Sequence, residues 1–317
     1  MKILIADSMH SSLFTMLKER GWTYSYHPEF KRQDIIDALP LYAGLIIRSK
    51  TFVDDEVMKA GRNLKFIARA GAGLDLIDLD IALMRKIQVF HAGEGNRDAV
   101  AEHALGMLLA LFNNIIRADR QVRQGTWDRE GNRGVEIMGK TVGIIGYGNN
   151  GGATAKRLSG FGCKVLAYDK YRDNYGDSFA EESGLERIMQ EADILSLHIP
   201  LTNETKFLVD EDFIDGFAKP FYLLNLSRGE TAKLSAIADG LKSGKIKGAG
   251  LDVLENEKLN NLKPQQQEAF DYLCSLDNVV LTPHIGGWTH ESYHRINEVL
   301  VRQIESWVGV QNVFSDM

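Results

Sequence analysis

The feature that most constrains the fold is a glycine-rich segment between two apolar runs. The β-branched run Thr141–Ile145 leads into a turn with glycines at Gly146, Gly148 and Gly151. A helical pattern then continues to Leu158. A second apolar run, Lys164–Tyr168, follows and ends in the carboxylate of Asp169. A dinucleotide-binding βαβ unit requires this order of strand, turn, helix and strand, so the segment predicts such a unit.

Each glycine of this turn has its own physical task. Gly146 permits the tight turn, Gly148 lets the backbone approach a pyrophosphate, and Gly151 lets the helix pack close to the sheet. The N-terminus of that helix offers N–H groups and a positive dipole end to the phosphates. Asp169 is placed to accept a hydrogen bond from a ribose 2′-hydroxyl, which favours NAD over NADP. Lys170 is expected to point elsewhere if the strand alternation continues.

Composition excludes several classes of protein. With 37 basic and 43 acidic residues, the net charge of −6 argues against nucleic acid or an anionic membrane as partner. The first residues resemble a strand and not a signal peptide, and only two cysteines, Cys163 and Cys274, are present. The longest apolar stretch, Leu105–Phe112, is too short to span a bilayer. We therefore expect a soluble, cytoplasmic protein.

Short apolar runs alternate with helical patterns along the chain, which predicts parallel sheets flanked by helices. A single sheet containing all of these runs would be unusual. We therefore expect an α/β fold with two doubly wound parallel-sheet domains, Rossmann-like or flavodoxin-like, and a cleft between them. One domain would comprise residues 1–98 and 287–317, and the NAD-binding domain residues 99–286. Long helices are expected over about 98–118 and 291–308. The runs expected as strands are Lys2–Ala6, Leu45–Arg48, Phe66–Arg69, Gln88–His91, Thr141–Ile145, Lys164–Tyr168, Ile194–His198, Tyr222–Leu226, Gly248–Val253 and Val279–Leu281.

Two motif matches fail the test of context. Gly134–Thr141 satisfies the Walker A pattern, but a strand follows it where a P-loop needs one to precede it. His290–His294 satisfies H-E-x-x-H, yet a zinc enzyme of this type needs a third ligand and a substrate cleft. We expect the start of a surface helix there, and no metal site.

Three polar segments follow strand ends, the edge at which open α/β sheets bind ligands. They are Asn225–Glu230, Asp252–Glu257 and Thr282–Gly287. Hydride transfer to a 2-keto acid needs an arginine to grip the carboxylate and polarise the carbonyl, and an acid to protonate the developing alkoxide. A histidine oriented by a carboxylate suits the second task near neutral pH. Taken singly, His284 could be a loop histidine and Arg228 part of a surface ion pair.

Together these segments resemble the D-isomer-specific 2-hydroxyacid dehydrogenase family nearly from end to end. The resemblance rests on four segments and Glu257. The segments are Gly139–Gly148, the His-x-Pro-x-Thr segment His198–Thr205, Ser227–Gly229 and Thr282–Gly287. It implies Arg228 as the substrate clamp, Glu257 as the partner of His284, and His284 as the acid and base. Lys258 stands where the family usually has proline, so Glu255 remains the alternative partner.

The resemblance also implies NAD and substrate contacts. Asp252 would hold the nicotinamide carboxamide. In the first domain, Arg69–Asp75 resembles the loop whose amides receive the substrate carboxylate, and Arg48–Thr51 resembles the other substrate loop. The expected substrate residues are Arg48, Ser49, Arg69, Ala72, Gly73 and Arg228. The expected cofactor residues are Gly146, Gly148, Asn149, Asn150, Gly151, Asp169, His198, Pro200, Thr205, Leu226, Ser227, Asp252, Gly286 and Gly287.

Two arginines on those loops, Arg48 and Arg69, suit a small anionic 2-hydroxy or 2-keto acid. The combination most resembles phosphoglycerate dehydrogenases, although no regulatory domain follows at the C-terminus, so feedback through such a domain is not expected. A glyoxylate or hydroxypyruvate reductase and an NADH-responsive corepressor-like binding protein are the alternatives. The resemblance further implies a homodimer through the cofactor domain, near the apolar stretch Ala101–Phe112 and the following Trp127.

Overall fold

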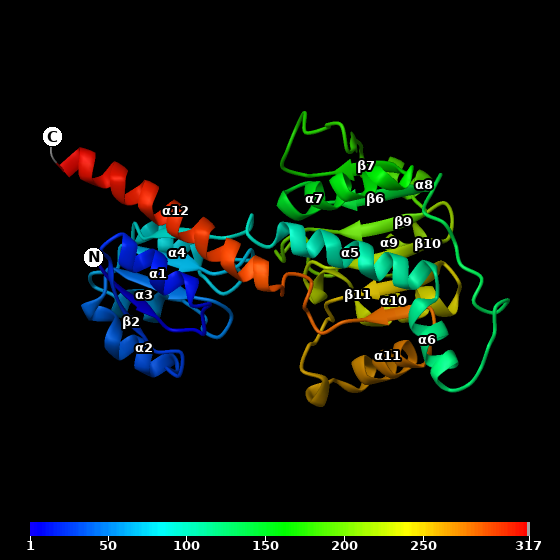
Figure 1. Ribbon diagram of the computed structural model, residues 1–317, viewed down its shortest axis with the longest axis horizontal. Coiled ribbons are helices and arrows are strands. Elements are labelled where there is room, and N and C mark those ends of the chain that lie inside the picture. The colour runs from blue at the N-terminus through cyan, green and yellow to red at the C-terminus, as the bar shows by residue number, and fades with distance from the viewer. Residues whose placement is uncertain (316–317) are drawn as a thin grey trace. The chain divides into compact units, whose positions relative to one another are not determined.

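The computed structural model, shown in Figure 1, describes residues 1–315. The chain forms two compact units. The smaller unit comprises Met1–Arg97 and the chain from Trp288 onward, and the larger unit comprises Asp98–Gly287.

The smaller unit contains a five-stranded parallel sheet of order β2-β1-β3-β4-β5. The order reverses between β1 and β3, which is the flavodoxin-like arrangement. Sequence analysis missed β2, an edge strand whose Thr-Tyr-Ser-Tyr sequence lacks a buried apolar face. The strands are β1 (Lys2–Ile5), β2 (Thr23–Tyr26), β3 (Gly44–Ile47), β4 (Phe66–Arg69) and β5 (Gln88–His91).

Helices cover both faces of this sheet. The C-terminal helix α12 (His290–Ser315) packs beside α1 (Ser12–Glu19), as Figure 1 shows. Its residues Ile296, Leu300 and Ile304 recur at intervals of four, so they share one face and enter the core. The other helices are α2 (Arg32–Ala38), η1 (Leu39–Leu41), α3 (Asp55–Ala60) and α4 (Leu79–Met84).

The larger unit contains a seven-stranded parallel sheet of order β12-β11-β10-β9-β6-β7-β8. Its first six strands in the chain have the Rossmann order, with the reversal between β6 and β9. The predicted α/β fold class with two doubly wound sheets is therefore confirmed. The strands are β6 (Thr141–Ile145), β7 (Lys164–Tyr168), β8 (Glu181–Glu182), β9 (Ile194–Leu197), β10 (Phe221–Asn225), β11 (Ile246–Leu251) and β12 (Val279–Leu281).

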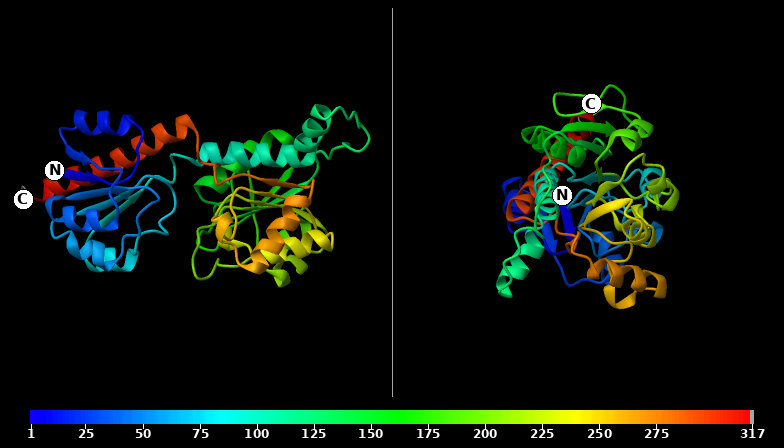
Figure 2. Two further views of the ribbon diagram at one scale, coloured as in Figure 1. Left: turned by 90° about the horizontal axis from the view of Figure 1, so that it is seen from below. Right: turned by 90° about the vertical axis from the view of Figure 1, so that its right-hand side faces the viewer.

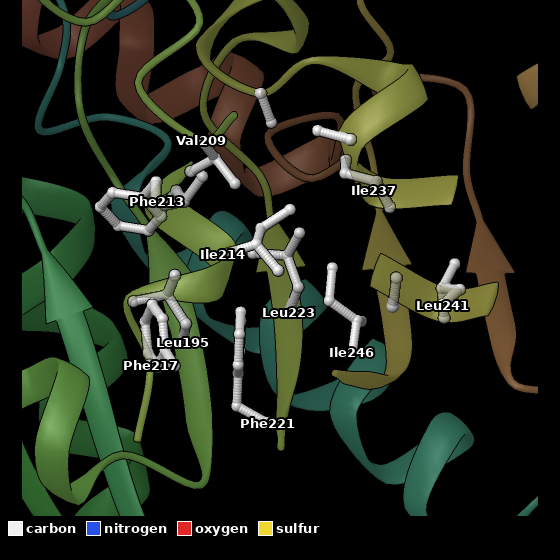
Figure 3. Close-up of a cluster of buried hydrophobic side chains, with 14 of the residues drawn as sticks. Leu195, Val209, Phe213, Ile214, Phe217, Phe221, Leu223, Ile237, Leu241 and Ile246 are labelled. Carbon is white, nitrogen blue, oxygen red and sulfur yellow. The ribbon is translucent and has the colours of Figure 1, made fainter. Parts of the chain in front are cut away.

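Two apolar clusters cover the two faces of the larger sheet. Neighbouring strand residues divide between them: Ile194 packs with α5 and α7, whereas Leu195 packs with α8 to α11 in the cluster of Figure 3. Burial on both faces explains why the strands are continuous apolar runs. The helices are α5 (Arg97–Phe112), α6 (Ile115–Arg123), α7 (Asn149–Leu158), η2 (Ser159–Phe161), α8 (Leu185–Glu191), α9 (Glu211–Asp215), η3 (Gly229–Thr231), α10 (Leu234–Lys242), η4 (Leu259–Asn261) and α11 (Pro264–Ser275).

The prediction of one long helix over 98–118 is wrong, because the structure has two helices there, α5 and α6. Asn114, with φ of 51°, is in the left-handed region, which asparagine tolerates better than most residues, and the two helices meet at 60°. In Figure 2, α6 and the segment after it project from the body of the larger unit. Within residues 1–315 no single helix is long and apolar enough to cross a membrane, although the bent α5–α6 pair together has that length and composition.

Candidate active site

The glycine turn joins β6 to α7 in the larger unit. Gly146 has a φ of 93°, which glycine adopts without steric cost. A Cβ atom on Gly151 would overlap the carbonyl oxygen of Gly146, so only glycine lets α7 begin so close to the strand. A Cβ atom on Gly148 would meet nothing within 4 Å. The turn therefore has a close-packed side and an open side, and the open side adjoins the N-terminus of α7, where phosphates bind well.

The loop after β9 lies directly behind this turn. A Cβ atom on Gly146 would come within 2.5 Å of the carbonyl oxygen of His198, so the two segments are in close contact. The His198 Nε2 atom lies 2.9 Å from the Ser196 hydroxyl, and burial lowers the pKa of His198 to about 4. The imidazole is therefore neutral at physiological pH. Farther along, the Thr205 hydroxyl donates to the carbonyl of Pro200 at 2.6 Å.

Two buried polar atoms near the turn have no hydrogen-bond partner among residues 1–315. They are Nδ1 of His198 and Oδ1 of Asn150, which follows Asn149 in the first turn of α7. Buried polar atoms in folded proteins are nearly always satisfied. Their presence beside an open, glycine-lined helix terminus fits a polar ligand with phosphates, and these features fit a dinucleotide.

Asp169 lies at the end of β7, next to the glycine turn. One carboxylate oxygen accepts from the amide of Tyr147 at 2.9 Å, and the other accepts from the amide of Tyr171 at 3.1 Å. Tyr147 lies between Gly146 and Gly148, so this contact joins the carboxylate to the turn. The acidic residue and the glycines that sequence analysis paired are therefore neighbours.

A second carboxylate, Asp252, organises the loop that carries the histidine. It is 2% exposed and accepts from the Thr282 hydroxyl at 2.6 Å and from the amides of Ile285 and Gly286 at 2.9 and 2.8 Å. Burial alone would raise the pKa of Asp252, but hydrogen bonds from His103, Thr282 and the two amides outweigh it and hold the pKa below its usual range.

His103 is a residue that sequence analysis missed. It lies on α5, and its Nε2 atom is 3.0 Å from the Thr282 hydroxyl and 3.4 Å from a carboxylate oxygen of Asp252. Because Thr282 donates to Asp252, its hydroxyl can accept from His103, which ties α5 to the loop. The available signal was a histidine, preceded by Glu102, at the start of the mainly apolar helical stretch Ala101–Phe112.

His284 and Glu257 meet as sequence analysis expected. His284 has a φ of 56°, and its amide donates to the carbonyl of Asp252 at 2.7 Å. Its Nδ1 atom lies 2.9 Å from a carboxylate oxygen of Glu257. The two side chains are 45% and 50% exposed. With Nδ1 directed at the carboxylate, Nε2 is the ring atom left to face a substrate.

The alternative carboxylate, Glu255, is used elsewhere. One oxygen accepts from the amide of Leu234 at 2.9 Å, and the other from the side chain of Gln266 at 2.7 Å. Glu255 thus joins the starts of α10 and α11. Lys258 donates its amide to the side chain of Asn256 at 3.0 Å, a bond that the proline usual at this position could not make. The structure places Glu257, not Glu255, beside His284.

Arg228 follows β10, the neighbour of β11, the strand that Asp252 follows. Its guanidinium donates to the carbonyl of Ser227 at 2.9 Å, and its own carbonyl accepts from the side chain of Asn225 at 3.2 Å. The buried Asn225 also accepts from the amide and hydroxyl of Ser227. Leu226 is buried as well. Hydrogen bonds within this short loop therefore fix its conformation. They place Arg228 at the carboxyl edge of the sheet, where open α/β sheets bind ligands.

In the smaller unit a pocket lies where the strand order reverses, beyond β1 and β3. The guanidinium carbon of Arg48 lies 4.2 Å from the ring centre of Trp288 and 4.1 Å from that of Tyr293, and the guanidinium donates to the Tyr293 hydroxyl. Sequence analysis missed both aromatic residues. The pocket is lined by Asp7, Ser8, Met9, His10, Pro28, Arg48, Ser49, Lys50, Trp288 and Tyr293.

The second expected substrate loop follows β4, the neighbour of β3. Arg69 ends that strand, and its guanidinium covers Gly71, where a Cβ atom would overlap it. Ala72 and Gly73 continue this loop on the same edge of the sheet. Arg48 and Ser49 line the pocket described above, whereas Arg69, Ala72 and Gly73 belong to the adjacent loop.

The H-E-x-x-H match lies in the first turns of α12. There His294 pairs with Glu298 at 3.3 Å, one turn farther along the helix. Within the part of the chain that the structure describes, no cluster of three or more His, Cys, Asp or Glu side chains could hold a metal ion.

Comparison with known proteins identifies relatives of the whole chain. Residues 105–286 match the family model "D-isomer specific 2-hydroxyacid dehydrogenase, NAD binding domain". The chain is 38% identical to a hydroxypyruvate reductase of Thermotoga maritima over 93% of its own length and 94% of that protein's. It is 34% identical to a D-3-phosphoglycerate dehydrogenase of Archaeoglobus fulgidus over 96% of its length, but spans only 56% of that protein.

Among solved structures, a D-lactate dehydrogenase of Aquifex aeolicus complexed with NAD and lactic acid superimposes with a TM-score of 0.83. The two chains are 25% identical, and the match covers 98% of this chain and 96% of that one. Sequence and structural similarity thus extend over both units. The chain belongs to the D-isomer specific 2-hydroxyacid dehydrogenase family, and residues 105–286 form its NAD-binding domain.

Proposed function

We propose that this NAD-dependent enzyme interconverts a D-2-hydroxy acid and its 2-keto acid through His284, Glu257 and Arg228. The observation that carries the proposal is the 2.9 Å contact between Glu257 and His284, which lies on the loop that Asp252 organises. When bound, NAD supplies the nicotinamide ring that accepts or returns the hydride. Gly148 and the N-terminus of α7 provide room and amide groups for its phosphates.

The contact between His284 and Glu257 indicates which ring nitrogen exchanges a proton with the substrate. With Nδ1–H donated to Glu257, the protonated ring delivers its Nε2 proton to the carbonyl oxygen as the keto acid is reduced. In the reverse direction the neutral Nε2 removes the hydroxyl proton. The carboxylate of Glu257 orients the ring by accepting from Nδ1–H. Arg228 would bind the substrate carboxylate and polarise the carbonyl.

We propose 3-phosphoglycerate and its keto acid as the substrate pair. Arg48 supports this choice, because a guanidinium binds a phosphate through two parallel hydrogen bonds and two aromatic rings hold it in place. Lys50 lines the same pocket and adds a second cation, 3.8 Å from the carboxylate of Asp7. The relationship to D-3-phosphoglycerate dehydrogenases agrees with this substrate. The alternative is hydroxypyruvate, which lacks the phosphate, and the relative that matches over nearly its whole length favours it.

The substrates are distinguished by measuring kcat/KM for NADH oxidation with 3-phosphohydroxypyruvate, hydroxypyruvate and glyoxylate. The phosphorylated acid is expected to give the highest value, by about tenfold or more. If hydroxypyruvate or glyoxylate gives the higher value, the protein is a reductase of that acid. Oxidation of NADH with none of the three would overturn the proposed substrate class.

We also propose a homodimer that forms through the larger unit. Many apolar residues of α5, such as Met107 and Leu111, are buried in the core of that unit. Exposed apolar side chains lie instead on α6 (Ile115, Ile116 and Val122) and on the segment after it (Trp127), and Figure 2 shows the backbone of both projecting from the larger unit. Light scattering at micromolar concentration is expected to give twice the monomer mass, and a monomer would refute this.

A cytoplasmic location is part of the proposal. Its support is chemical: Cys163 and Cys274 are both free thiols, as is usual in a reducing compartment.

A further inference from the structure

An ion-pair cluster lies beside the carboxylate that selects the cofactor. Lys170 directly follows Asp169, and its ammonium nitrogen lies 2.6 Å from a carboxylate oxygen of Glu204. The Tyr171 hydroxyl donates to the same oxygen at 2.7 Å. Glu204 belongs to the loop after β9, which faces the segment after β7 across the reversal point of the sheet. Two loops that are distant in sequence therefore meet next to Asp169.

Hydrogen bonds inside its loop hold Glu204 in place. The Thr202 amide donates to the Thr205 hydroxyl at 2.8 Å, and the Thr205 amide donates to the Thr202 hydroxyl at 3.2 Å. These reciprocal bonds bracket Glu204 and define the turn that carries it. The carboxylate is 55% exposed, so its position comes from the turn and from Lys170 and Tyr171, and not from burial.

The other cation of this segment is also engaged. The guanidinium of Arg172 donates to the carbonyl of Tyr147 in the glycine turn and lies 6.0 Å from the ring centre of Tyr175. Both basic side chains that follow Asp169 are thus bound by groups of the protein. This arrangement matters because proteins that bind NADP place a basic side chain near this position to receive the 2′-phosphate.

We propose that Glu204 is a specificity-determining residue that disfavours NADP. It holds Lys170, the cation best placed by sequence to meet a 2′-phosphate, and it adds a second negative charge near Asp169. A phosphate monoester carries a charge of about −1.5 to −2 at neutral pH, so it would face two carboxylates and no available ammonium group. The ribose 2′-hydroxyl of NAD is neutral and is unaffected by this arrangement. The inference rests on the NAD site proposed above.

The test measures binding and does not require turnover. Dissociation constants for NADH and NADPH are obtained from the fluorescence of the bound nicotinamide, for the unaltered protein, Glu204→Gln and Glu211→Gln. Glu211 is the matched control, because it pairs with Lys233 at 3.0 Å with similar exposure but lies in α9 and not in the loop that carries Glu204. Glu204→Gln is expected to tighten NADPH binding about tenfold and to change NADH binding less than about twofold, a difference of about 1.4 kcal/mol. Glu211→Gln should change neither.

A second variant tests the role of the lysine. In the Glu204→Gln background, Lys170→Gln should remove most of the gain in NADPH binding, because the released ammonium group makes the new contact. The inference is overturned if Glu204→Gln leaves NADPH binding unchanged, if Glu211→Gln tightens it equally, or if the gain survives the loss of Lys170. Failure of the unaltered protein to bind NADH would instead refute the proposed cofactor site, which separates the two hypotheses.

Discussion

The two sheets place ligand-binding loops at the same topological position but hold them by different means. At the reversal point of the larger sheet, most contacts involve the backbone: Gly146 and Gly151 permit close approach, and the amide of Tyr147 donates to Asp169. At the reversal point of the smaller sheet, side chains line the pocket, and Arg48 packs against two aromatic rings that meet edge to face.

This difference indicates a division of tasks. A site built from backbone amides and glycines tolerates few substitutions. Such a site suits a cofactor that stays the same whichever acid is the substrate. A pocket built from side chains can change its ligand through one substitution without refolding a turn. We infer that the larger unit determines the chemistry and the smaller unit selects the acid, and the following variants test that inference.

The largest effect is expected at His284. His284→Ala should lower kcat/KM in both directions by roughly 10²–10⁴-fold, the usual loss of a general acid and base. Steady-state rates with the best substrate, in both directions and at several pH values, provide the measurement.

Glu257→Gln and Glu255→Gln are the matched pair for that result. Glu257→Gln should lower kcat in both directions by about tenfold or more, because an amide can hold the His284 ring in the wrong tautomer. Glu255→Gln should change stability more than kcat, because Glu255 bonds Leu234 and Gln266. The reverse pattern would show that the partner of His284 has been misassigned.

The next largest effect is expected from removing the charge of Arg48 in the smaller unit. Arg48→Met keeps an apolar side chain against Trp288 and Tyr293 but removes the charge. Loss of a charge-assisted hydrogen bond is worth about 1.5–3 kcal/mol, so KM for the phosphorylated acid should rise about 10- to 100-fold. KM for glyoxylate should change by less than about threefold. Equal effects on both acids would mean that Arg48 is structural, and the phosphoglycerate proposal would fall.

Two glycine substitutions probe the larger unit. Gly151→Ala inserts a methyl group against the Gly146 carbonyl and should lower the free energy of unfolding by about 1–3 kcal/mol. Gly148→Ala points into open space, so stability should change by less than about 0.5 kcal/mol while NADH binding weakens. Chemical denaturation and NADH titration of both variants separate packing from binding. Intact NADH affinity in Gly148→Ala would contradict the assignment of the open side to the phosphates.

The smallest effect concerns acid stability of the larger unit. The pKa of His198 is about 4 when folded, below its unfolded value of about 6.5, so the unfolded chain binds more protons between these values. The contribution of His198 to the free energy of unfolding is therefore fully present above about pH 6.5. It falls as the pH drops toward 4, and about 2 kcal/mol is lost at pH 5. His198→Gln keeps a group able to bond Ser196 but does not titrate. Denaturation at pH 7 and pH 5 should show a smaller loss in the variant, and parallel losses would refute the assignment.

Apolar patterning predicted most strands but failed where patterning carries no signal. Thr141–Ile145 and Lys164–Tyr168 were predicted to the residue, because strands buried on both faces are continuous apolar runs. The edge strand Thr23–Tyr26 has partly exposed polar and aromatic residues, and it was missed. The break at Asn114 was missed as well, because the chain is helical on both sides of this single left-handed residue.

The sequence by itself determined the local features: the glycine turn, the acid after the next strand, and the polar segments at the strand ends. These depend on residues close together in the chain, whose geometry follows from steric and hydrogen-bonding rules. Tertiary structure alone decided that Glu257 and not Glu255 meets His284, that His103 supports Asp252, and that Glu204 holds Lys170. Those pairs join loops from different strands, and only the packing of the sheet decides which loops become neighbours.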